Sequence, residues 1–122
     1  MLRIVVAVFV VLHGLVHLLY VGQSQRLFEL QPGMVWPDGS WVFSRLLGDQ
    51  GTRAVASACC VLAALGFVVG GIGLLARQAL WRPLVAGTAA FSAAMLLVLW
   101  DGQMQRLYDQ GGIAVLVNLA ML

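Results

Sequence analysis

Three long stretches of apolar residues dominate the chain, and none of them contains Asp, Glu, Lys or Arg. Their ranges are 4–22, 54–76 and 84–100, about 17 to 23 residues each, which is enough for a helix to cross a bilayer. A fourth stretch, 112–122, would form a helix of only about 17 Å against a hydrocarbon core of roughly 30 Å. The pattern predicts an all-α, polytopic transmembrane helical bundle with three clear spans and a short fourth.

The segment between the first two spans, residues 23–53, is the one substantial polar part of the chain. Pro32-Gly33 and Pro37-Asp38-Gly39 are strong turn signals within it, so it cannot be a transmembrane helix. Ser40 is placed to cap a short helix over residues 41–47, whose apolar side chains predict a position on the bilayer surface. We therefore expect an extramembrane or interfacial loop between the first and second spans.

Composition supports a membrane protein, because 61% of the residues are hydrophobic and 10% are charged, against roughly a quarter charged in a soluble domain. The length fits one bundle, so we expect a single transmembrane domain over residues 1–122. Its seven basic residues are all arginines, spread singly along the chain, which excludes nucleic acid as a partner. The first apolar stretch continues without a small-x-small cleavage site, and we expect it to be an uncleaved span.

The arginines divide unevenly between the two sides of the predicted bundle. Arg3, Arg77 and Arg82 fall on one side without nearby acids, whereas the other four arginines lie among the acidic residues on the opposite side. Arginine close to the spans favours the cytoplasmic side. We therefore expect a cytoplasmic N-terminus.

Four tryptophans flank the predicted spans, and tryptophan is enriched where a membrane protein meets the interface. Trp36 and Trp41 lie in the loop, and Trp81 and Trp100 lie at the two ends of the third span. We expect all four to be interfacial anchors. For the loop pair, the alternative is a cap over the bundle that acts as a lid.

His13 and His17 are the only histidines, and their spacing puts both on one face of the first span, about 6 Å apart along its axis. Ionisable side chains at membrane depth usually turn inward to a partner or a cavity. We favour neutral histidines that hydrogen-bond across helices and fix the packing, with Gly14 letting a neighbouring helix approach. The alternatives are contact with a small, quinone-like ligand and ligation of a metal or haem.

Counting residues from the same outer surface places several further side chains near the depth of His17, roughly 6 to 11 Å inside. They are Cys59, Cys60, Met95 and Asn118, which would bring thiol, thioether and carboxamide groups beside the imidazole. Imidazole with soft sulfur suits copper(I), although Cys and Met are also ordinary apolar fillers, and we favour the latter interpretation. The sequence requires no cofactor, and haem, quinone and copper stay open as ligands of this layer.

Small residues recur at four-residue spacing on the second and third spans. Gly66 and Gly70 on the second match Ala86, Ala90 and Ala94 on the third. Such spacing lets two membrane helices approach closely. We predict that these residues form the contact between the two spans.

Catalytic constellations are otherwise absent: the sequence has no serine nucleophile with a matched base, no carboxylate pair within a span and no phosphate-binding loop. We therefore predict a noncatalytic accessory or scaffold subunit that contacts the lipid bilayer and other membrane subunits or copies of itself. One alternative is a binding protein for a lipophilic or metallic ligand. A second is a small-solute transporter that works as an oligomer.

A resemblance rests on the string His13-Gly14-Leu15-Val16-His17-Leu18-Leu19 in a small four-span chain, with Trp100-Asp101-Gly102 after the third span and Asn118 in the last. This layout resembles uncharacterised bacterial membrane proteins of the DoxX-like type, without the glycine-rich opening helix of DoxX proper. The resemblance implies a four-helix bundle in the bacterial inner membrane and a helper or quinone-proximal role. It implies no functional residue, because the group has no agreed site.

Overall fold

The computed structural model describes all 122 residues, and its only regular secondary structure is helical, without strands. Three helices are long and apolar enough to cross a membrane, with mean hydropathies of 2.5, 2.4 and 1.6 in chain order. The predicted all-α transmembrane bundle with a short fourth helix is therefore confirmed. The elements are α1 (Leu2–Ser24), α2 (Phe43–Leu75), α3 (Trp81–Leu99), η1 (Met104–Arg106), η2 (Tyr108–Gly112) and α4 (Ile113–Met121).

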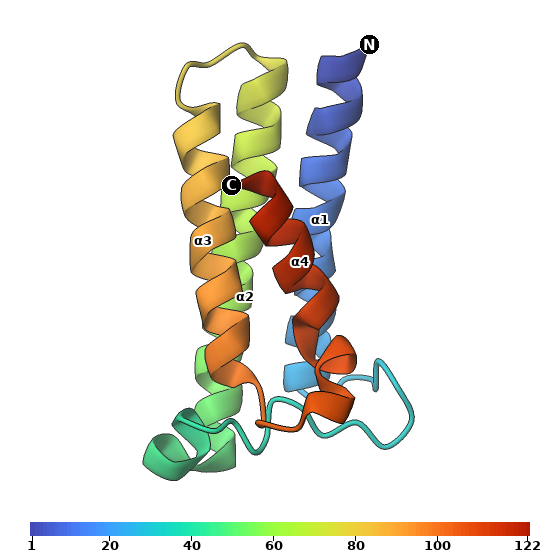
Figure 1. The fold of residues 1–122 in the computed structure, drawn as a ribbon, viewed down its shortest axis with the longest axis vertical. Coiled ribbons are helices and arrows are strands. Elements are labelled where there is room, and N and C mark those ends of the chain that lie inside the picture. Colours follow the sequence, from blue (N-terminus) through green and yellow to red (C-terminus); the bar gives the residue numbers. More distant parts are fainter.

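The three long helices run side by side, and α4 covers only the half of the bundle nearest the loop (Figure 1). Helix α2 contacts both α1 and α3, whereas α4 packs against α3. We call the two ends of the bundle the loop end, which holds residues 25–53 and 100–112, and the hairpin end, which holds the start of α1 and the α2–α3 connector (Figure 1).

Glycine allows the close packing of α1 against α2. A Cβ atom added at Gly14 would lie 2.7 Å from the Cβ of Phe67 and 3.1 Å from the carbonyl oxygen of Ala64. Lipid supplies no hydrophobic force between helices, so such close van der Waals contact is a main source of their association. The expected role of Gly14 is confirmed.

The predicted glycines of α2 do lie at its contact with α3, but the residues they meet there are not the predicted alanines. A Cβ atom at Gly66 would collide with Thr88, and one at Gly70 would lie 2.5 Å from Val85 Cγ2. The predicted alanines do not fill this contact: Ala90 and Ala94 are exposed, and Ala86 is only half-buried. An almost wholly apolar span carries no periodic signal for its inward face, and here the face that turns inward carries Thr88 and Ser92.

The short helix expected over residues 41–47 is present as residues 43–47, the first part of α2. The Ser40 hydroxyl accepts a hydrogen bond of 3.2 Å from the backbone N–H of Phe43, at the first residue of the helix. The helix then breaks at Gly48, whose φ of 70° and ψ of 179° are accessible almost only to glycine. The part of α2 beyond Gly48 forms the second span.

Helices α1 and α2 end in the same backbone motif. In each, the residue after the C-cap has a positive φ, 59° for Arg26 and 58° for Arg77. The N–H groups of Leu27 and Gln78 then bond the carbonyls of Gly22 and Gly73, at 3.0 and 2.9 Å. This is a Schellman motif, in which glycine is usual at the positive-φ position and another residue costs about 1–2 kcal/mol.

Candidate functional site: a polar cluster between the helices

The predicted histidine pair lies inside the bundle, surrounded by three helices. His17 is fully buried, and His13 is 8% exposed. Ser92 of α3 and Asn118 of α4 are also fully buried and come to the same place. These four residues are the polar cluster.

Hydrogen bonds join the four residues of the polar cluster in a ring, and the donor and acceptor of each bond can be assigned. His17 Nδ1 lies 3.1 Å from the carbonyl oxygen of His13, so this nitrogen carries the proton and donates. His17 Nε2 then accepts from the Ser92 hydroxyl at 2.6 Å. The Ser92 oxygen accepts from Asn118 Nδ2 at 2.8 Å, and Asn118 Oδ1 accepts from His13 Nε2 at 2.8 Å. This assignment satisfies the chain of bonds with both imidazoles neutral.

The polar cluster links α1 to α3 and α4 through hydrogen bonds. The bond from Ser92 to His17 joins α3 to α1, and the bond from His13 to Asn118 joins α1 to α4. Aromatic contacts hold the imidazoles, because the Phe67 ring lies edge-on to that of His13 with centroids 4.9 Å apart. The expected cross-helix hydrogen bonding of the two histidines is confirmed.

The sulfur-containing residues of the predicted layer lie in an adjoining apolar core. Cys60 and Met95 are 1% and 7% exposed and pack with Trp36, Leu96 and Leu99. Met95 lies one turn from Ser92 on α3, but the hydrogen bonds of the polar cluster join only His13, His17, Ser92 and Asn118. No three His, Cys, Asp or Glu side chains come together to hold a metal ion. The predicted layer therefore separates into a polar cluster and an apolar core.

The four tryptophans occupy different environments. Trp41 is 58% exposed, and Trp81 and Trp100 are half-buried, as side chains at an interface can be. The prediction of an interfacial anchor is wrong for Trp36. Its side chain is 2% exposed, and its indole N–H donates to the Leu99 carbonyl at 3.1 Å. The loop folds back over the end of α3, so Trp36 fills the apolar core instead of facing the interface.

Two important polar residues carried no clear signal in the sequence. Ser92 was the single serine of an apolar span, where a serine often bonds only its own helix. Gln23 looked like the first residue of a polar loop, yet it is fully buried. Its amide donates to the carbonyls of Met34 and Trp36 at 3.0 and 3.2 Å and accepts from Leu30 N–H at 2.8 Å, so it holds the loop against α1.

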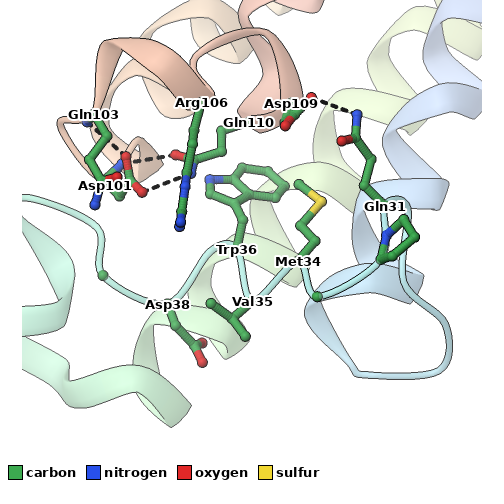
Figure 2. Close-up of a pocket in the computed structure, with 13 residues that line it drawn as sticks. Gln31, Met34, Val35, Trp36, Asp38, Asp101, Gln103, Arg106, Asp109 and Gln110 are labelled. Atoms are coloured by element: carbon green, nitrogen blue, oxygen red, sulfur yellow. Dashed lines mark hydrogen bonds between the residues drawn. The ribbon is translucent and has the colours of Figure 1, made fainter.

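A second, hydrophilic site lies at the loop end, where a cavity of about 360 Å³ separates residues 31–39 from residues 101–110. Figure 2 shows the Arg106 side chain extending beside the Trp36 indole in this cavity. Asp101 accepts from the backbone N–H of Gln103 and from the side chain of Gln110, at 2.8 and 2.9 Å. The cavity wall is thus built mainly from polar groups that bond one another.

Comparison with protein-family models, curated proteins and solved structures finds no match to this chain. The resemblance to DoxX-like proteins stays a prediction.

Proposed function

We propose that this protein is a noncatalytic accessory or scaffold subunit of a larger membrane assembly. The observation that carries the proposal is the closed set of hydrogen bonds in the polar cluster. Both histidines of the chain are used there, to join α1 with α3 and α4. The best candidates for chemistry in the sequence therefore serve the packing of the bundle.

A ligand at the polar cluster would have to break bonds that already exist. The Ser92 hydroxyl and the Asn118 amide each bond to two partners within it. Leaving one such buried group without a partner costs about 1–3 kcal/mol. This cost favours a structural role for the cluster over a site for quinone, haem or copper.

The outward face of α3 supports contact with another membrane helix. Gly87, Ala90 and Ala94 are exposed, and a Cβ atom at Gly87 would meet nothing within 4 Å. Small side chains at this spacing let a neighbouring backbone approach closely. We propose that a partner subunit or a second copy packs here, in a bacterial inner membrane with the N-terminus in the cytoplasm.

Purification from the native membrane in a mild detergent tests the proposal. We expect stoichiometric partners, or a homo-oligomer, to remain attached to the wild-type chain and to be lost from the variant Ala90→Leu/Ala94→Leu. The matched control is Ala58→Leu, which makes the same change on an exposed position of α2 and should keep the partners.

A monomeric wild-type chain without partners would contradict the proposal, as would equal loss in the control. A chromophore or metal that stays bound, and disappears in His13→Leu/His17→Leu, would instead identify a ligand-binding protein.

A further inference from the structure

A basic cavity of about 370 Å³ lies at the hairpin end, opposite the cavity of Figure 2. Its wall includes Arg3 from the start of α1, Arg77 and Gln78 from the connector, and Trp81 and Arg82 from the start of α3. Figure 1 shows that these segments meet at the same end of the bundle. Arg3 is thus brought beside Arg77 and Arg82, which are far from it in sequence, and the three arginines surround one space.

No acidic residue balances these arginines. The chain has five acidic residues, Glu29, Asp38, Asp49, Asp101 and Asp109, and all belong to segments at the loop end. The ion pairs of the structure join Arg26 and Arg53 to Asp38, and none involves Arg3, Arg77 or Arg82. The basic cavity therefore holds a net positive charge that only a group from outside the chain can neutralise.

The backbone at Arg77 adds an independent observation. Arg77 occupies the positive-φ position of a Schellman motif, where glycine would be free of strain. Arg26 occupies the same position of α1, and its side chain bonds Asp38 and the carbonyl of Val35. Arg77 makes no comparable bond inside the chain, so its guanidinium is available to a ligand.

The surroundings of the basic cavity match the boundary between water and lipid. Trp81 lines it, and the Arg82 guanidinium carbon lies 5.5 Å from the Trp81 ring centroid, in cation–π contact. The exposed apolar side chains Leu75 and Leu80 lie beside it in the chain, where acyl chains would cover them. Guanidinium groups bind phosphate through paired hydrogen bonds.

We propose that the basic cavity binds the phosphate headgroup of an anionic phospholipid. A lipid is favoured over a free anion because the cavity opens at helix ends flanked by apolar side chains, where anionic headgroups are concentrated. The site does not depend on the proposed subunit role, because every residue in it belongs to this chain.

Lipid titration of the purified full chain, followed by native mass spectrometry, tests the site. The probes are phosphatidylglycerol and phosphatidylcholine with identical acyl chains. We expect the wild-type chain to prefer phosphatidylglycerol, and Arg77→Gln to weaken that binding about fivefold. The triple variant Arg3→Gln/Arg77→Gln/Arg82→Gln should bind both lipids equally.

Two further variants test whether a loss of lipid preference comes from a change in net charge or from unfolding of the chain. Arg45→Gln removes one exposed arginine at the loop end and should leave the preference unchanged. Arg77→Gly relieves the positive-φ strain, so it should unfold no more easily than the wild type and still bind phosphatidylglycerol about fivefold more weakly. Absence of a preference in the wild type, or equal loss in Arg45→Gln, would overturn the proposal. Displacement of the lipid by excess inorganic phosphate would overturn the assignment to a lipid, since it would identify a free-anion site.

Discussion

Arginine has opposite roles at the two ends of the bundle. At the loop end, Arg26 and Arg53 both pair with Asp38, and Arg26 also bonds loop carbonyls. At the hairpin end, Arg77 and its neighbours have no acidic partner. Arg26 and Arg53 therefore stabilise the chain itself, whereas the arginines of the hairpin end stay available to a group from outside the chain.

The contrast is sharpest between Arg26 and Arg77, because their backbones are nearly identical. Both follow a helix C-cap with φ near 60°, and both helices have glycine at the position that accepts the closing hydrogen bond. Only the loop that follows α1 is long enough to return an aspartate to its arginine. The same local motif therefore serves different purposes, depending on what the tertiary structure brings to its side chain.

The largest effect is expected at the loop end, from Trp36→Ala. This change removes a buried indole and its bond to Leu99, and should lower the free energy of unfolding by about 3–5 kcal/mol. Thermal unfolding in detergent and limited proteolysis of residues 25–42 measure it. Trp41→Ala is the control, because that exposed indole should contribute about 1 kcal/mol through its bond to Leu97. Equal losses would show that the loop end is not held by a buried tryptophan.

Between the two ends, Asn118→Leu tests the polar cluster. It leaves the ring N–H of His13 without an acceptor and should lower the free energy of unfolding by about 1–3 kcal/mol. Adding His13→Leu removes that unpaired donor, so the double variant should lose less than the sum of the single losses. Additive losses would show that the two side chains do not interact.

The smallest effects come from glycine at the two positive-φ arginines, and they should differ in sign. Arg77→Gly should raise the free energy of unfolding by about 0.5–1 kcal/mol, because it relieves strain without breaking a bond. Arg26→Gly gains the same relief but loses the bonds to Asp38 and the loop carbonyls, for a net loss of about 1 kcal/mol. Denaturant unfolding of the two variants measures the difference. Equal changes in the free energy of unfolding would show that the Arg26 side chain contributes no more to stability than that of Arg77.

Part of the polar cluster was predictable from the sequence. The spacing of His13 and His17 placed both rings on one helix face, and the cost of burying them in lipid required partners inside the bundle. Gly14 between them indicated the close approach of α2. The identity of Ser92 was not predictable, because a lone serine in an apolar span gives no sign of whether it bonds its own helix or a neighbour.

The apolar stretches alone were enough to predict a helical membrane protein, because a segment in lipid must satisfy every backbone N–H and C=O within a helix. Tertiary structure alone decided which faces of those helices turn inward, since spans that are apolar all round carry no pattern to orient them. It turned Ala90 and Ala94 of α3 outward and Ser92 inward. It also buried Trp36 and Gln23, because the returning loop brings backbone carbonyls to side chains that the sequence places in a polar segment.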